Sequence, residues 1–293
     1  MFPSINRYID YNHFKNNKNR IQKLFRQSNN PLSIIKNENE NGILDIQNQL
    51  NSNYLIKITD FSNNSISISI PIKGDQLEIL EPKIIHKTDD FIYAQEGSSI
   101  TKGKFNIYIP ANSFYEDTYL NIVANVDTLK LHEDIIPLHK NITIATDVSN
   151  YNKTDIDKLY IGRLNYKKEP YYVKNYRKGN KLIAKTKKLG TYVLTVDTKN
   201  PEIKPLNFLN KKWISNNKTL KIKISDDLSG ISSYRATING KFILMEYDYK
   251  KDVLTYDFND QIISEVENNL KLIVIDNVGN NTTFESTFFR KQT

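Results

Sequence analysis

Alternation of apolar and polar residues is the strongest pattern in the chain. Isoleucines at positions 66, 68 and 70 alternate with serines over residues 65–70, which is the period of a strand with one buried face. The apolar segment 54–58 precedes it, and the polar segment 60–64 between them predicts a turn. This pattern predicts a β-hairpin over residues 54–70.

A similar unit recurs near the C-terminus. Residues 270–275 and 283–289 predict two strands, and the Asn- and Gly-rich segment 276–281 between them suits a tight turn because these residues adopt positive φ readily. We interpret the two hairpins as the closing strands of two related immunoglobulin-like sandwiches. The strand and turn predicted at 233–241 have no counterpart before residue 54, so we expect the first sandwich to lack its opening strands.

A different β pattern lies between the two hairpins. It comprises predicted strands at 104–109, 119–123, 160–161, 171–173 and 190–196, with a turn at 110–117. Residues 197–205 contain two prolines and predict a linker. The one candidate helix covers residues 12–27, where Phe14, Ile21 and Leu24 could share a face.

These patterns predict an all-β chain of tandem β-sandwich domains, immunoglobulin-like at both ends with a different β module between. We expect an incomplete immunoglobulin-like domain at 1–74, a middle β-sandwich module at 75–197 and a C-terminal immunoglobulin-like domain at 198–293. Whether residues 1–74 fold alone, and whether the chain is a natural product or a fragment, is left open by the pattern.

Composition agrees with folded domains and narrows the chemistry. Hydrophobic residues make up 39% of the chain, with 18 Tyr and 13 Phe, which is enough for real cores. The net charge of +8 is spread along the chain, so it does not suggest a nucleic-acid groove. The chain has no Cys, which excludes disulfides, thiolate nucleophiles and Cys-ligated zinc. No apolar run is long enough to span a membrane, and no signal peptide is visible at the N-terminus.

Catalytic motifs are not found in the sequence. It contains no Gly-x-Ser-x-Gly elbow, no Walker loop and no Gly-x-Gly-x-x-Gly loop. His132 and His139, with Glu133 and Asp134 beside them, lack regular metal-ligand spacing and predict an ordinary polar loop. We therefore predict a protein that is not an enzyme, with no catalytic or metal-binding residues and no cofactor.

The segment Asp226-Asp-Leu-Ser-Gly230 allows two interpretations. Adjacent carboxylates could form half of a calcium loop, because calcium prefers oxygen ligands. The favoured interpretation is an Asx-type turn between two strands.

The most suggestive stretch for binding is 166–188, where many Lys and Arg residues accompany four Tyr and a single acidic residue. Aromatic rings stack on sugars or bases, and basic side chains attract anions. The favoured interpretation is a solvated hairpin whose tyrosines supply β propensity, followed by binding to an anionic glycan or surface, and last by nucleic acid. The candidate anionic-surface residues are Tyr166, Lys167, Lys168, Tyr171, Tyr172, Lys174, Tyr176, Arg177 and Lys178.

Several segments also resemble a known family. They are Ile5–Tyr11, Arg20–Phe25, Pro31–Ser33, Asp226–Ile231, Ile238–Lys241, Met245–Asp248, Leu254–Phe258 and Asp276–Asn280. These segments resemble the region downstream of the catalytic domain in large Bacteroidetes lysostaphin-type zinc metallopeptidases, a family of peptidoglycan endopeptidases. The turn around Ile109–Phe114 also resembles the Pro-Ala-Gly-Ala-Phe turn of other bacterial β modules.

The resemblance implies the accessory region of such a peptidase alone. The family binds zinc through a His-x(3)-Asp motif and a His-x-His motif. His86 and Asp90 have the spacing of the first, but this chain has no His-x-His, so the pair of motifs is not present. It implies a cell-envelope or periplasmic location and a spacing or surface-targeting role. The implied partners are a cell-wall glycan or other anionic surface and a peptidase domain on the same or a neighbouring chain, with no nucleic acid. The alternative is a free-standing, adhesin-like envelope module that binds glycan or protein.

Overall fold

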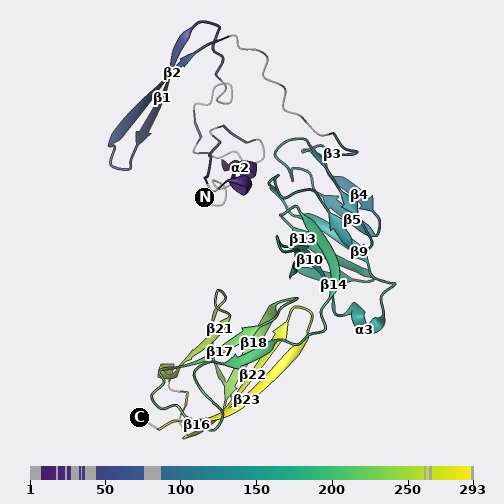
Figure 1. Ribbon diagram of the computed structural model, residues 1–293, viewed down its shortest axis with the longest axis vertical. Helices are drawn as coiled ribbons and strands as arrows, with labels where there is room; N and C mark the ends of the chain where they lie inside the picture. Colours follow the sequence, from purple (N-terminus) through teal and green to yellow (C-terminus); the bar gives the residue numbers. More distant parts are fainter. Residues whose placement is uncertain are drawn as a thin grey trace. The chain divides into compact units, whose positions relative to one another are not determined.

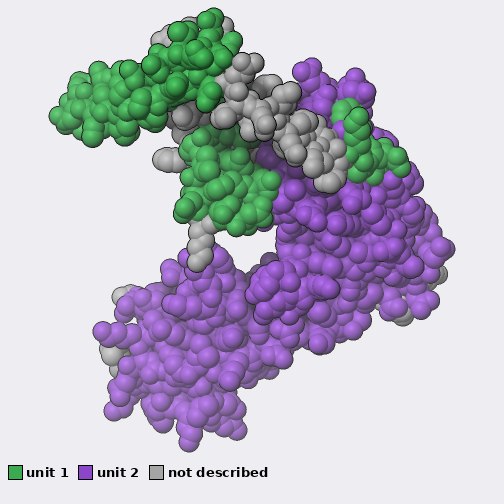
Figure 2. All heavy atoms as spheres, turned by 45° about the horizontal axis from the view of Figure 1, so that its top comes forward, with its two compact units in different colours: residues 1–91 green, residues 92–293 purple. Residues whose placement is uncertain are grey.

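The computed structural model describes residues 8–17, 19–23, 25–27, 33, 35–36, 44–75, 87–260, 262–263 and 266–291. The chain divides into two compact units, residues 1–91 and 92–293, which Figure 2 colours separately. Each unit is described by itself below. Among the described residues, no helix is long and apolar enough to cross a membrane.

The helix of the first unit is much shorter than the sequence pattern predicted. Helix α2 (Tyr11–Asn16) begins after Asp10, whose side chain accepts a hydrogen bond from the backbone amide of His13. Ile9 then pairs with Gln22 in an isolated antiparallel bridge, so the chain has already turned back. The helix predicted at 12–27 is therefore wrong beyond Asn16, because Asn-rich sequence favours caps and turns over helix interiors.

The predicted hairpin in this unit is confirmed. Strands β1 (Asn51–Thr59) and β2 (Ser65–Lys73) pair antiparallel, and Asp60 closes the turn by accepting hydrogen bonds from the amides of Ser62 and Asn64. They form a separate two-stranded sheet (Figure 1). Within the described residues no second sheet covers it, and Ile66 remains 63% exposed.

The second unit begins with a β-sandwich, called here the middle domain (residues 92–197). One sheet has the order β11-β10-β14-β8-β7 and the other β12-β13-β9-β5-β4. The strands of the first sheet are β7 (Val123–Ala124), β8 (Thr128–Lys130), β10 (Leu159–Leu164), β11 (Pro170–Tyr172) and β14 (Thr191–Val196). Those of the second are β4 (Ser98–Lys102), β5 (Phe105–Ile109), β9 (Ile142–Asp147), β12 (Asn175–Lys178) and β13 (Lys181–Thr186). β3 (Asp90–Ile92) and β6 (Thr118–Leu120) make a short extra sheet, and α3 (Lys153–Ile156) precedes β10.

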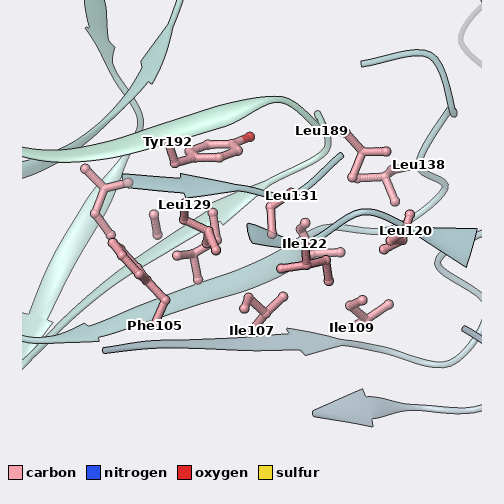
Figure 3. Packing of buried hydrophobic residues seen from close by; sticks show 14 of the residues in the cluster. Phe105, Ile107, Ile109, Leu120, Ile122, Leu129, Leu131, Leu138, Leu189 and Tyr192 are labelled. Carbon is pink, nitrogen blue, oxygen red and sulfur yellow. The ribbon is translucent and has the colours of Figure 1, made fainter. Parts of the chain in front are cut away.

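The core of the middle domain comes from the inward-facing side chains of both sheets. In β5, Phe105, Ile107 and Ile109 are buried and alternate with exposed Asn106 and Tyr108. Figure 3 shows the three buried side chains of β5 gathered with those of other segments, among them Leu129 and Tyr192. In a β-sandwich, the inward-facing side chains of the two sheets pack against each other, which explains why buried and exposed residues alternate along each strand.

A second sandwich follows, called here the C-terminal domain (residues 198–291). Its strands are β15 (Glu202–Pro205), β16 (Lys212–Trp213), β17 (Thr219–Ser225), β18 (Ile231–Ile238), β19 (Lys241–Ile243), β20 (Glu246–Asp248), β21 (Val253–Asp257), β22 (Glu267–Asp276) and β23 (Asn281–Phe289). A 3-10 turn, η3 (Phe258–Asp260), follows β21. The sheets have the orders β15-β17-β21-β20 and β16-β23-β22-β18-β19. The first order matches strands A-B-E-D of an immunoglobulin-like sandwich, and β23-β22-β18 matches G-F-C.

The prediction of an all-β chain with tandem β-sandwiches is therefore confirmed. The linker predicted at 197–205 is wrong for its second half, because residues 202–205 form edge strand β15, paired with β17. Proline is tolerated there because an edge strand leaves one side of its backbone unpaired. The turns predicted at 60–64 and 276–281 and the strands around them match the structure.

Candidate functional site

The structure distributes the nine predicted binding residues over two opposite sheets. Edge strand β11 belongs to one sheet of the middle domain and edge strand β12 to the other, and Lys174 lies in the connection between them. The stretch 166–188 is therefore two hairpins, β10–β11 and β12–β13, instead of one. Because the chain changes sheet between β11 and β12, the nine side chains do not form one surface.

The first group lies at the tip of the β10–β11 hairpin. Tyr166, Lys167 and Lys168 are exposed, and the Lys167 ammonium lies 5.8 Å from the centre of the Tyr166 ring. Asn165 closes the turn by accepting hydrogen bonds from the amides of Lys167 and Glu169. This tip presents one aromatic ring and two cations to solvent.

Three of the predicted residues have structural partners within the domain. The Tyr171 hydroxyl accepts a hydrogen bond of 2.6 Å from Arg163 Nη1, and the Tyr172 ring lies 5.9 Å from the ring of Tyr160. Arg177 forms an ion pair of 2.8 Å with Asp157. These contacts suit the packing role that was the favoured interpretation of the stretch.

Tyr176 and Lys178 lie on the outer face of the β12-β13-β9-β5-β4 sheet. Lys181, Ile183 and Lys185 of β13 share that face, because Leu182 and Ala184 of the same strand point into the core; Ile183 is opposite Tyr176 and Lys181 is opposite Lys178. Tyr108 of β5 lies on the same face, three strands from β12, and is 50% exposed, and Tyr176 is 51% exposed. The residues of this basic face are Tyr108, Tyr176, Lys178, Lys181 and Lys185.

One acidic residue also lies on the basic face. Asp147 of β9 is directly opposite Lys181, and its pKa is lowered by hydrogen bonds from Ser149 and by the charge of Lys181. Asp147 offsets one of the three lysine charges. The face therefore carries a net positive charge with two exposed tyrosine rings, and of its five residues only Tyr176 and Lys178 belong to the nine predicted ones.

The polar loop predicted around the two histidines has ordinary structural contacts. His132 Nδ1 accepts a hydrogen bond from the Asn121 amide, and burial lowers the pKa of His132. Asp134 pairs with Arg163 at 2.9 Å, and His139 Nδ1 lies 3.2 Å from the Tyr115 hydroxyl. Within the described ranges, these residues do not form a group that could hold a metal ion.

The junction of the middle and C-terminal domains is the other feature with candidate chemistry. Asn280 Nδ2 donates a hydrogen bond of 2.9 Å to the carbonyl of Asp197, at the end of the middle domain. Ser229 donates its amide to Asp197 Oδ2 at 2.9 Å, and Lys158 Nζ donates to the carbonyl of Val278 at 3.1 Å. These bonds join β10 and the end of β14 to two loops of the C-terminal domain.

Three carboxylates meet at this junction. One oxygen each from Asp197, Asp226 and Asp276 lies within 4.8 Å of the others, and Asp197 and Asp276 are buried. Asp226 follows β17 and makes the predicted Asx turn, accepting hydrogen bonds from the amides of Leu228 and Gly230. Of these three residues, only Asp226 was recognisable from the sequence as a candidate ligand. Residues of three distant loops that meet in space share no local sequence pattern.

The comparisons with known proteins concern the β domains. Residues 89–197 match the family model of the Zu5-like domain, which covers less than half of the chain. No curated protein matches the chain. Among solved structures, the chain is similar to the fibronectin(III)-like modules of Clostridium thermocellum CbhA at 13% identity, with a TM-score of 0.26, covering 59% of this chain and 94% of that one.

Proposed function

We propose that the chain is the non-catalytic accessory region of a cell-envelope peptidase, with the role of holding it on an anionic cell-wall polymer. The basic face of the middle domain carries this proposal. Exposed tyrosine rings beside lysines suit a polymer that presents sugar rings and anionic groups together. The resemblance of the chain ends to lysostaphin-type metallopeptidases supplies the peptidase and the peptidoglycan in this proposal.

The arrangement of charge on the basic face favours weak, multivalent contact. Lys178 and Lys181 face each other across the β12–β13 hairpin, and Lys185 follows on the same face of β13. A flat sheet face offers no enclosed pocket, so each contact with a polymer is exposed to solvent. Exposed charges are screened over about 8 Å at physiological ionic strength, and binding should therefore weaken as salt rises.

The test is cosedimentation of the full chain with purified peptidoglycan that retains its anionic polymers. We expect binding that decreases with salt and that falls strongly when Lys178, Lys181 and Lys185 are all replaced by Glu. The matched control replaces Lys167 and Lys168 by Glu at the β10–β11 tip, which leaves the basic face intact. Equal binding by the wild type and the triple variant would exclude the basic face as the contact surface.

A free-standing adhesin-like module is the alternative function, and it would use the same face. The two differ in their partner: the accessory region requires a catalytic domain on the same or a neighbouring chain. That domain would carry the His-x(3)-Asp and His-x-His motifs of the peptidase family. Adding such a domain to the full chain should increase peptidoglycan release only under the first proposal.

A further inference from the structure

The oxygens of Asp197, Asp226 and Asp276 are spaced as they would be around one cation. Calcium binds six to eight oxygens at about 2.3–2.6 Å, so two ligands on opposite sides of the ion lie about 4.8 Å apart. The three carboxylate oxygens all lie within 4.8 Å of one another. They therefore fit within a single coordination shell.

Backbone amides hold each carboxylate in place. Asp226 Oδ2 accepts hydrogen bonds from Leu228 and Gly230, and Asp276 Oδ1 accepts from Val278 and Asn280. Asp197 Oδ1 accepts from the amide of Lys199. A carboxylate has about four acceptor sites on its two oxygens, so each of the three groups keeps at least one site for another partner, and its position does not depend on the side-chain rotamer alone.

Buried hydroxyls without a partner provide an independent indication of a ligand. The Tyr160 hydroxyl and Ser229 Oγ have no hydrogen-bond partner among the described residues, although Tyr160 is 0% exposed and Ser229 is 1% exposed. The Ser229 amide binds Asp197 Oδ2, so its side chain starts at the cluster. Buried polar groups are nearly always hydrogen-bonded, so the unpartnered Ser229 Oγ next to Asp197 indicates a place for a ligand.

Tyr160 lies on β10 close to Asp197. It pairs with Thr195 of β14, and the Asp197 amide donates to the carbonyl of Lys158, two residues before Tyr160. Tyr160 is buried yet belongs to neither hydrophobic core. Its side chain is therefore buried outside the core of the middle domain, on the strand that runs beside Asp197.

No protein cation neutralises the three carboxylates. In the part of the chain that the structure describes, none of them takes part in an ion pair, and the ammonium of nearby Lys158 donates to the Val278 carbonyl. A bound cation would therefore offset the mutual repulsion of the three carboxylates.

The donor set selects the kind of cation. The group contains only carboxylates, with hydroxyls and loop carbonyls nearby and no His or Cys. Zinc favours nitrogen and sulfur ligands, and magnesium requires near-ideal octahedral geometry and retains several waters. Calcium accepts irregular oxygen shells of this kind.

We propose that Asp197, Asp226 and Asp276 bind one calcium ion at the junction of the middle and C-terminal domains. Ser229 Oγ and several waters, one of them held by the Tyr160 hydroxyl, complete the shell. Because Asp197 ends the middle domain and the other two carboxylates belong to loops of the C-terminal domain, the ion links the two domains. This site does not depend on the peptidoglycan-binding role proposed above.

The first test is calorimetric titration of the full chain, stripped with a chelator, with calcium chloride alone. We expect one saturable site per chain and a rise in the unfolding temperature when calcium is present. Asp226→Asn keeps an oxygen for the turn hydrogen bonds but loses the charge, and should weaken calcium binding about tenfold or more. Asp257→Asn is the matched control, because Asp257 accepts a similar turn hydrogen bond from the Asn259 amide and pairs with Thr219, at the opposite end of β17 from Asp226.

A reversal of stability distinguishes a calcium ligand from a merely structural aspartate. In chelator, Asp226→Asn should unfold at the same or a higher temperature than the wild type, because one of three repelling charges is removed. In calcium the order should reverse. A variant that is less stable by the same amount in both conditions would overturn the proposal, as would the absence of saturable calcium binding by the wild type.

Terbium luminescence locates the bound ion by a measurement that does not require the Asp variants to fold. Terbium occupies calcium sites and emits when a neighbouring tyrosine is excited. Tyr160→Phe should reduce this emission, and Tyr249→Phe, at a side chain 73% exposed, should not. Emission that is unchanged in Tyr160→Phe would place the ion elsewhere and contradict the proposal.

Discussion

Arg163 shows how much of the middle domain depends on one side chain. Its guanidinium pairs with Asp134 at 2.9 Å, donates to the Leu189 carbonyl and donates to the Tyr171 hydroxyl. Both charged side chains are only 14% exposed. Gly190 is required beside it, because φ is +116° there and a Cβ would lie 2.9 Å from the guanidinium.

Replacing Arg163 by Met should therefore be strongly destabilising. The variant leaves Asp134 largely buried without its cation, and breaking such a pair costs about 3 kcal/mol of unfolding free energy. Urea denaturation followed by circular dichroism measures this loss. Arg177→Met is the control, because its pair with Asp157 is 42% and 69% exposed and should contribute less than about 1 kcal/mol. Similar losses in both variants would contradict this account.

At the scale of single residues, the sequence predicted interactions between chain neighbours better than contacts between distant segments. The Asx turn of Asp226 was predictable, because a side-chain oxygen and the amides two and four residues later are neighbours in the chain. The meeting of Asp226 with Asp197 and Asp276 was not, since it depends on how two domains abut. Tyr160 also looked like an ordinary strand residue, and only its unpartnered buried hydroxyl distinguishes it.

At the scale of elements, the period-2 alternation predicted most strands because a sandwich buries one side of each strand. The pattern failed where an element is short. Edge strand β15 has only four residues with alternating partial burial, and Pro205 within it and Pro201 before it resembled a linker. The basic stretch was predicted as one hairpin, because the sequence does not show that β11 and β12 belong to opposite sheets.

The two predicted hairpins should differ in how well they are protected from hydrogen exchange. β1–β2 and β22–β23 have similar antiparallel pairing, but Ile66, Ile68 and Ile70 are 63%, 48% and 43% exposed. Leu270, Leu272 and Val274 are at most 1% exposed, in the core of the C-terminal domain. An isolated two-stranded hairpin is marginal in water, so it should open often.

Amides of residues 54–70 should therefore exchange much faster than those of 270–289. Hydrogen exchange of the full chain, followed by mass spectrometry, compares the two hairpins in one sample. Equally strong protection of both hairpins would mean that the first hairpin is covered in solution.

At the scale of the whole molecule, the junction decides whether the two sandwiches act as one body. Each has its own hydrophobic core, one within residues 92–196 and the other within residues 203–288. The hydrogen bonds described between them are those of Ser229 and Asn280 to Asp197 and that of Lys158 to the Val278 carbonyl. Sequence periodicity predicts the cores but contains no information on this polar contact.

Asn280→Ala should loosen the two domains relative to each other while leaving both folded. Its side chain is 7% exposed and donates to both the Asp197 carbonyl and Asp276 Oδ2, so the variant removes a bond that crosses the junction.

Because the chain has no Cys, spin labels can be placed at Val126→Cys and Leu244→Cys, where the native side chains are 82% and 71% exposed. The distance distribution between the labels should be narrow in the parent chain and broad in Asn280→Ala. Asn207→Ala also removes two side-chain hydrogen bonds, but both lie within the C-terminal domain, so its distribution should stay narrow. A broad distribution in the parent chain would show that these bonds do not hold the domains together, and the spacing role would then rest on the linker alone.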